Sequence, residues 1–303
     1  MTVYDMPLWR PPSEAQNLII QATLGCSFNA CTFCAMYKTK AYSAKPLDQV
    51  FADIDGAAQD WPPDSPGARR VFLADGDALT LETDHFLAIL QKLRATFPEL
   101  ARVSCYATPL NLNKKSHEEL VALKAAGLTL VYLGLESGSD EILKRIHKGS
   151  ASAMESALKR AIGAGLKVSA TVILGLGGKA LWREHIEQTA ALINRQPPKF
   201  LSTLQLGLDA DMEPRFKDAF AKRGAPFVWQ DDAGVLDELE FLLEKLAPPR
   251  AVIFRTNHAS NCLALAGTLP KDGPRLLDQV RQVQDQVAQA GLAAVRPRHL
   301  RGL

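Results

Sequence analysis

Short apolar segments alternate along the chain with longer segments in which apolar residues recur every three or four positions. Because the short segments end at glycine, acidic or polar residues, they are predicted to be buried strands. The longer segments have the spacing of amphipathic helices. The pattern predicts strands at 18–24, 71–74, 103–107, 128–135, 168–174 and 201–206, with a last short strand at 251–254, and helices at 47–59, 84–96, 116–127, 140–147, 151–163, 180–193, 233–246 and 271–290.

Strand and helix alternate six times, at intervals of about 30 to 50 residues, which predicts parallel strands joined by helical crossovers. An open doubly wound sheet and a barrel both satisfy this alternation. Residues 1–17 are rich in proline and are predicted to be irregular, and residues 61–67 are predicted to form a turn-rich loop. The fold class is therefore α/β, and the pattern alone does not choose between sheet and barrel.

Composition excludes several classes of protein. The chain has 303 residues, 47% of them hydrophobic, which is enough for a sizeable core. Its net charge of +2 leaves no electrostatic footprint for nucleic acid. No apolar run is long enough to span a membrane, and the start lacks the pattern of a secretory signal, so a cytoplasmic location is expected.

Three of the five cysteines, Cys26, Cys31 and Cys34, fall within nine residues in the spacing C-x4-C-x2-C. Thiolates at this spacing can converge on one metal centre, and three ligands suit an iron–sulfur cluster. Structural zinc usually takes four protein ligands, and Cys105 and Cys262 do not form a second pair. A thioredoxin-type redox pair would use Cys31 and Cys34 but leave Cys26 unexplained. Three unrelated thiols remain the other alternative.

The segment Gly25–Cys34 resembles the cluster-binding loop of radical S-adenosylmethionine (SAM) enzymes. In that superfamily, three cysteines hold three irons of a [4Fe–4S] cluster, and SAM chelates the fourth iron through its amino and carboxylate groups. The usual spacing is C-x3-C-x2-C, so the first gap is one residue longer here. Phe33 matches the aromatic residue before the third cysteine, and the resemblance implies that its backbone meets the adenine of SAM.

Two further strand ends are similar in position to SAM-binding segments of the superfamily. Asp75-Gly76-Asp77 follows the second predicted strand, where these enzymes often carry Gly-Gly-Glu and bind the amino end of SAM. The same three residues are also typical of a plain turn. Leu174 and Gly175 end the fifth predicted strand, where the resemblance implies backbone contacts to adenine.

Glu136 and Ser137 follow the fourth predicted strand. Residues 132–145 closely resemble the radical SAM group that includes oxygen-independent coproporphyrinogen oxidase and the Elongator catalytic subunit, which implies that Glu136 and Ser137 bind SAM. Carboxylates commonly accept hydrogen bonds from ribose hydroxyls, and a carboxylate that leaves a buried strand is costly without a partner. The alternative is that this segment only caps the next helix.

Residues 255–261 form a polar loop that would close the open side of a barrel and meet the substrate. In that role His258 would transfer protons and Arg255 would bind a carboxylate or phosphate. The alternative is a polar loop with a helix cap. The other histidines are predicted to be surface or interface residues: His85, His117, His147, His185 and His299.

The resemblance covers residues 13–265 and implies a radical SAM enzyme with a partial (β/α)6 barrel, residues 1–265, and a C-terminal helical extension, residues 266–303. It implies that Cys26, Cys31 and Cys34 bind the [4Fe–4S] cluster, and that SAM is the second cofactor. A flavodoxin- or ferredoxin-type protein would supply the electron. Cleavage of SAM would give a 5′-deoxyadenosyl radical that acts on a small molecule or a peptide.

Other functions stay open at this point. The longer first gap keeps transfer of the aminocarboxypropyl group of SAM as an alternative. A radical methylthiolase would need an auxiliary cluster, for which two further cysteines are too few. A non-catalytic scaffold or redox sensor would bind zinc, or a cluster that does not respond to SAM. A thiol oxidoreductase would form a reversible disulfide between Cys31 and Cys34.

Overall fold

The computed structural model describes residues 4–62, 65 and 67–302. Residues 1–3 of the predicted irregular start, and 63, 64 and 66 of the predicted loop, lie outside the described residues. The chain divides into two compact units, which we describe separately. The first unit contains Met1–Asn29, Met36–Leu133 and Ser156–Val168, and the second contains Ala30–Ala35, Gly134–Glu155 and Ser169–Leu303.

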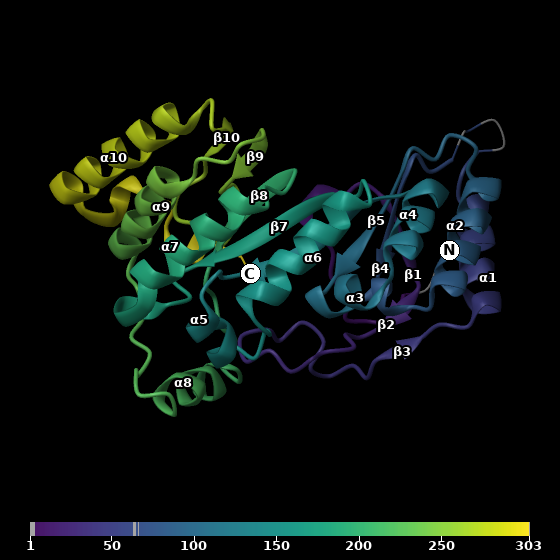
Figure 1. Cartoon of the computed structure of the whole chain (residues 1–303), viewed down its shortest axis with the longest axis horizontal. Helices are drawn as coiled ribbons and strands as arrows, with labels where there is room; N and C mark the ends of the chain where they lie inside the picture. The colour runs from purple at the N-terminus through teal and green to yellow at the C-terminus, as the bar shows by residue number, and fades with distance from the viewer. Residues whose placement is uncertain (1–3, 63–64, 66, 303) are drawn as a thin grey trace. The chain divides into compact units, whose positions relative to one another are not determined.

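Parallel strands form the centre of the first unit. Strand β1 pairs with β4, β4 with β5, and β5 with β6, all in parallel. Helices α1, α2 and α4 pack side by side next to β1, β4 and β5 (Figure 1). The elements are β1 (Leu18–Gln21), the antiparallel pair β2 (Thr23–Leu24) and β3 (Ser43–Ala44), β4 (Arg70–Ala74), β5 (Arg102–Ala107), β6 (Leu128–Glu136), α1 (Leu47–Gln59), α2 (Thr83–Thr96), α3 (Pro109–Lys114), α4 (His117–Ala126), η1 (Pro12–Glu14) and η2 (Ala78–Thr80).

The core of this unit follows from the apolar pattern of its elements. All four residues from Val71 to Ala74 in β4 are buried, as expected for a parallel strand that is covered on both faces. Helix α2 buries Phe86, Ile89, Leu90 and Leu93, which lie on one face of the helix. The Ser116 side chain and Glu119 form a capping box at the start of α4.

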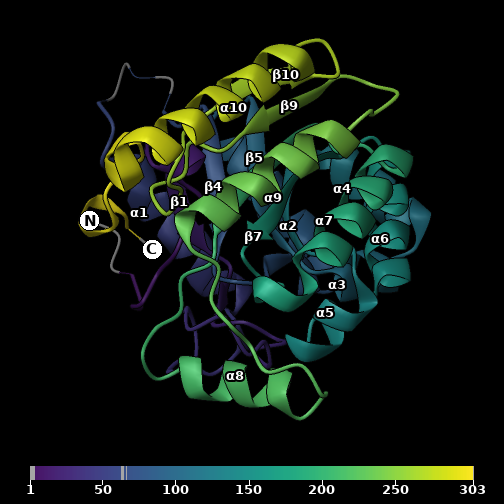
Figure 2. The same ribbon diagram turned by 90° about the vertical axis from the view of Figure 1, so that its left-hand side faces the viewer.

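The second unit continues the alternation of strand and helix. Strand β8 pairs in parallel with β7 and β9, and β10 pairs with β9 in the antiparallel direction. Helix α9 packs against both α7 and α10 (Figure 2). The elements are β7 (Lys167–Leu174), β8 (Phe200–Gln205), β9 (Val252–Arg255), β10 (Ala266–Leu269), α5 (Asp140–Arg145), α7 (Gly178–Arg195), α8 (Glu213–Ala221), α9 (Asp232–Lys245), α10 (Gly273–Ala290), η3 (Gly291–Ala294) and η4 (Arg298–Leu300). Helix α6 (Ala151–Gly163) belongs to the second unit up to Glu155 and to the first unit from Ser156.

The predicted α/β class is confirmed, and the predicted helices and strands are found within two residues of their predicted ends. The exception is the single strand predicted at 18–24, which is two strands: β1 pairs with β4, and β2 pairs with β3. The sequence pattern missed the strands β3 and β10 and the helices α3 and α8. Strand β10 contains Ala266 and Gly267, which have weak strand propensity, and its hydrogen bonds with β9 compensate for that weakness. Residues 266–269 are therefore a strand, and the domain boundary at 265 stays a prediction. Within the described part of the chain, no helix is long and apolar enough to cross a membrane.

Candidate radical SAM site

Two glycines let the loop of Cys26 pass close to the end of β4. Gly25 has a φ of +68°, and a Cβ there would lie 2.8 Å from the carbonyl oxygens of Lys40 and Ala41. Gly76 packs against Cys26, because a Cβ on Gly76 would lie 3.1 Å from the Cβ of that cysteine. A side chain at Gly25 would collide with the main chain of Lys40 and Ala41, and one at Gly76 would collide first with the Tyr37 ring and then with Cys26, so both positions require glycine.

The segment Asp75-Gly76-Asp77 anchors this loop. The Gly25 N–H donates to Asp75 Oδ2 at 3.0 Å, and the Gly76 N–H donates to the Gly25 carbonyl at 3.1 Å. The Ser27 hydroxyl donates to Asp77. Within the first unit, the structure therefore brings the predicted SAM-binding segment next to the first predicted cluster ligand.

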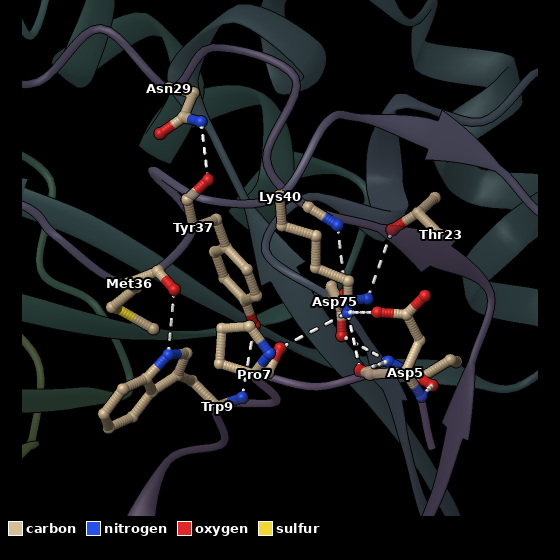
Figure 3. Close-up of polar contacts among 11 residues, drawn as sticks. Asp5, Pro7, Trp9, Thr23, Asn29, Met36, Tyr37, Lys40 and Asp75 are labelled. Carbon is tan, nitrogen blue, oxygen red and sulfur yellow. Dashed lines mark hydrogen bonds and ion pairs between the residues drawn. The ribbon is translucent and has the colours of Figure 1, made fainter. Parts of the chain in front are cut away.

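Lys40 and Asp75 form a buried ion pair beneath the same loop (Figure 3). The Lys40 Nζ lies 2.7 Å from Asp75 Oδ2, and both side chains are almost fully buried. The ammonium also donates to the Asp5 carbonyl at 2.6 Å and lies 3.1 Å from the Asp5 carboxylate. Gln21 donates to Asp75 Oδ1 at 3.0 Å. Both oxygens of Asp75 thus already accept hydrogen bonds, and its contact with SAM stays a prediction.

In the second unit, Lys148 brings a cation close to Cys31, Cys34 and Glu136. Its Nζ lies 3.2 Å from Glu136 Oε1 and 5.9 Å from the centre of the Phe33 ring. Burial raises the pKa of Glu136, and the Lys148 cation opposes that shift. Burial lowers the pKa of Lys148, but Glu136 and the two thiols outweigh this effect, so the net shift is upward and the ammonium stays charged.

This environment suits metal-binding thiols, because a nearby cation favours the thiolate form that binds metals. Cys31 and Cys34 are not joined in a disulfide, and Thr32 between them donates its N–H to the Ile146 carbonyl at 3.2 Å, which anchors this part of the loop. Sequence reasoning missed Lys148, because a lysine that follows a short helix is expected to lie on the protein surface.

Ser137 and His185 form a buried pair. The Ser137 Oγ lies 2.8 Å from His185 Nδ1, and His185 Nε2 lies 2.9 Å from the Ile173 carbonyl. A carbonyl only accepts, so Nε2 carries the proton and Nδ1 accepts from the Ser137 hydroxyl. Burial lowers the pKa of His185 to about 4. The predicted surface location of His185 is wrong, because this histidine lies on the buried face of α7. The role of Ser137 toward SAM stays a prediction.

Leu174 and Gly175 line a cavity of about 400 Å³ within the second unit. The Gly175 N–H donates to Glu238 Oε2 at 2.7 Å, and Gln230 donates to the other oxygen of Glu238 at 3.1 Å. Burial raises the pKa of Glu238 to about 7. Sequence reasoning missed Glu238, because a glutamate in an amphipathic helix gives no signal that it points inward.

The folded-state pKa of Glu238 predicts a pH-dependent stability. The pKa is raised from 4.5, so folding favours the protonated carboxyl, and the stabilisation is present below pH 4.5 and lost as pH rises through 7. We expect the free energy of unfolding to fall by about 3 kcal/mol over this range because of Glu238. Urea unfolding at several pH values measures it. Glu238→Gln should remove this pH-dependent part of the free energy of unfolding, whereas the exposed neighbour Asp237→Asn should retain it. The same dependence of unfolding free energy on pH in wild type and Glu238→Gln would contradict the raised pKa of Glu238.

His258 lies near the same cavity, through Ser260. The His258 Nδ1 accepts from the Ser260 N–H at 3.2 Å and lies 2.8 Å from the Ser260 hydroxyl, and Ser260 lines the cavity. Burial lowers the pKa of His258, which favours the neutral ring. Arg255 ends β9 with an exposed side chain. The catalytic roles of His258 and Arg255 stay predictions.

The three cysteines belong to different units: Cys26 to the first, and Cys31 and Cys34 to the second. Across residues 4–62, 65 and 67–302, no three histidine, cysteine, aspartate or glutamate side chains are grouped so that they could hold a metal ion. Their role as cluster ligands therefore stays a prediction, supported by the donor chemistry of the loop.

Comparison with known proteins identifies the class. A family model described as the radical SAM superfamily matches residues 20–193, which is more than half of the chain. The chain belongs to this superfamily and is an enzyme of the radical SAM class, whose cofactors are a [4Fe–4S] cluster and SAM. The resemblance inferred from the cysteine loop and the strand ends is confirmed.

Solved structures show the same fold. Methylornithine synthase (PylB) superposes with a TM-score of 0.53 at 14% identity, over 87% of this chain and 68% of that one. The radical SAM methyltransferase TsrM from Kitasatospora setae, solved with tryptophan substrate and a SAM analogue, gives a TM-score of 0.53 at 17% identity, over 73% of this chain and 43% of that one. The predicted fold of the radical SAM type is confirmed.

A curated relative from Methanocaldococcus jannaschii, provisionally named a methylthiotransferase, is 26% identical over 167 residues. The match covers 52% of this chain and 35% of the relative. This chain thus spans about a third of the length of that relative, so the activity of the whole relative is not carried over.

Proposed function

We propose that this protein cleaves SAM reductively at a cluster bound by Cys26, Cys31 and Cys34, and that its substrate is a small molecule or a peptide. Superfamily membership supports the proposal, and so does one observation: the buried Lys148 cation lies 3.2 Å from Glu136 and interacts electrostatically with Cys31 and Cys34. When bound, the reduced cluster and SAM supply a 5′-deoxyadenosyl radical, which abstracts hydrogen from carbon.

Charged residues of this chain would hold the polar ends of SAM. Lys148 would pair with the SAM carboxylate, because it is a permanently charged donor close to two predicted ligands. Glu136 would accept from the ribose hydroxyls. The amino group of SAM would donate to main-chain carbonyls of residues 75–77, since the side chains of Asp75 and Asp77 already accept hydrogen bonds within the protein.

Backbone and apolar groups would hold the adenosine. The main chain of Phe33 and of Leu174 and Gly175 would meet the edges of adenine. Glu238 accepts the hydrogen bond of the Gly175 N–H and so positions this strand end. Radical SAM enzymes need a reductant, and we propose a flavodoxin- or ferredoxin-type protein as the electron donor.

The alternatives make different demands on the chain. Methylthio transfer with an auxiliary cluster would need further cysteine ligands, and Cys105 and Cys262 are buried separately in β5 and after β9. Burial raises the pKa of Cys262 to about 11, so this thiol stays protonated. Aminocarboxypropyl transfer would release methylthioadenosine where radical cleavage releases 5′-deoxyadenosine. A scaffold or a redox sensor would release no nucleoside.

Chromatography of SAM incubated with the reduced, anaerobically reconstituted protein tests the proposal. We expect 5′-deoxyadenosine and methionine, lost in Cys34→Ala and retained in the matched control Cys262→Ala. Methylthioadenosine would instead identify the aminocarboxypropyl branch. A full, reducible cluster that gives neither product would overturn the proposal.

A further inference from the structure

The cavity beside Leu174 and Gly175 has one wall made by the segment that follows α10. Its volume of about 400 Å³ falls in the range of small-molecule sites, roughly 300–1,000 Å³. Apolar and aromatic groups on one side include Leu174 and Trp229, while Arg298 and Arg301 from the following segment bring two guanidinium groups to it. Such a mixture of apolar surface and a few polar groups is typical of ligand sites.

The wall is fixed in place by buried contacts. The Arg296 N–H donates to the Cys262 carbonyl at 2.9 Å, and Val295 is buried. Arg301 makes a two-pronged contact with Asp232, with Nη1 at 2.8 Å from Oδ1 and Nη2 at 2.9 Å from Oδ2. Asp232 is itself buried, so the pair is desolvated and holds the segment against the cavity.

The charges of this wall do not balance. Asp232 is the carboxylate that both guanidinium groups approach, and Arg301 and the Gln205 amide already donate to it. The Arg298 Nε lies 3.8 Å from Asp232 Oδ2, beyond hydrogen-bond distance, and its side chain is 70% exposed. Two cations thus share one anion, and Arg298 keeps its donors for another partner.

Two buried polar atoms lie on the elements that carry the cavity wall, behind its lining residues. Thr203 Oγ1 and Asn261 Oδ1 are buried and have no hydrogen-bond partner among the described residues. Thr203 lies two positions before Gln205 on β8, and Asn261 follows Ser260, and both Gln205 and Ser260 line the cavity. Neither residue lines the cavity and both atoms are buried, so a molecule in the cavity does not contact them.

We propose that this cavity binds a substrate with an anionic oxygen group, a carboxylate or a phosphate, and that Arg298 is the partner of that group. The apolar body of the substrate would lie against Trp229 and Leu174, next to the strand end assigned to adenine. Arg301 is a positioning residue, because its guanidinium is used by Asp232. The inference rests on the proposed function only in calling the ligand a substrate.

Isothermal titration of the anaerobically reconstituted full chain tests the proposal with three defined probes. These are 3-indolepropionate, its neutral amide and phenyl phosphate. We expect one of the two anions to bind at least about 10-fold more tightly than the amide, which corresponds to the net gain of a charge-assisted hydrogen bond. Each anion reports on its own oxygen group, through the loss of its binding in Arg298→Gln.

Two matched variants locate the site. Arg298→Gln should reduce the affinity for the anion to the affinity for the amide. Arg296→Gln removes the same charge from the same segment and should retain the difference in affinity between anion and amide. Equal losses in both variants, equal binding of anion and amide, or no binding at about 10 mM would overturn the proposal, because an affinity weaker than this is non-specific.

A competition titration with SAM tests whether SAM occupies the same cavity as the anion. If SAM displaces the anion and Arg298→Gln weakens SAM in parallel, the site belongs to the SAM carboxylate and the inference is wrong. SAM cleavage is measured on the same samples. A protein that cleaves SAM but shows no Arg298-dependent anion binding refutes this inference alone, and one that binds the anion without cleaving SAM refutes the proposed function alone.

Discussion

Replacement of Lys148 by methionine should weaken SAM binding about 30- to 1,000-fold, because removing one partner of a buried charge pair costs about 2 to 4 kcal/mol. The change removes the cation beside Glu136 and close to Cys31 and Cys34. Glu136 then becomes a buried carboxylate without its partner and is expected to take up a proton. Equilibrium dialysis of labelled SAM against the reconstituted protein measures the effect.

Two controls separate this role from a structural one. Lys144→Met removes the same charge from the exposed face of α5 and should leave SAM binding unchanged. Lys148→Arg keeps the cation and should restore most of the affinity. Iron content is measured for each protein. A Lys148→Met protein that contains full iron and binds SAM as wild type does would refute the role of this lysine.

Replacement of Asp75 by asparagine should destabilise the protein by about 3 to 5 kcal/mol, because it leaves the buried Lys40 ammonium without its main counterion. Lys40→Met should cost a similar amount, since it leaves a buried carboxylate unpaired. The double variant should recover part of the loss, because neither charge is then buried. Urea unfolding of the four proteins measures this coupling.

Asp5→Asn is the matched control. The Asp5 carboxylate also lies within 3.1 Å of Lys40, but 54% of its side chain is exposed, so its loss should cost less than about 1 kcal/mol. Hydrogen exchange at the Gly25 amide, which donates to Asp75, should accelerate in Asp75→Asn and not in Asp5→Asn. Similar unfolding curves for Asp75→Asn and Asp5→Asn would show that the ion pair does not anchor the loop.

The apolar pattern predicts most of the fold because burial on both faces of a parallel strand leaves a continuous apolar run, as in β6. Helix α1 is predicted with its observed bounds, Leu47–Gln59. Helix α8 was missed because only Phe216 and Phe220 are buried on it, too few to establish a period. Strand β10 depends on pairing with β9, which no local pattern contains.

Some residues of the candidate site can be predicted from the sequence, and others cannot. The cysteines, Glu136 and the segment 75–77 stand out because their residue types are unusual at strand ends and match a family. Lys40, Lys148 and Glu238 do not, because a lysine or glutamate gains a function only through partners that the fold brings to it. Buried ion pairs between segments distant in sequence have no local pattern, so sequence reasoning finds one partner and misses the other.

The electron paramagnetic resonance spectrum of the reduced, reconstituted protein, recorded with and without SAM, tests the central claim most directly. That claim is that Cys26, Cys31 and Cys34 hold a [4Fe–4S] cluster that leaves one iron for SAM. We predict the signal of a reduced cluster whose g values shift when SAM is added, and no such signal from Cys34→Ala. A cluster signal that saturating SAM leaves unchanged would contradict the account.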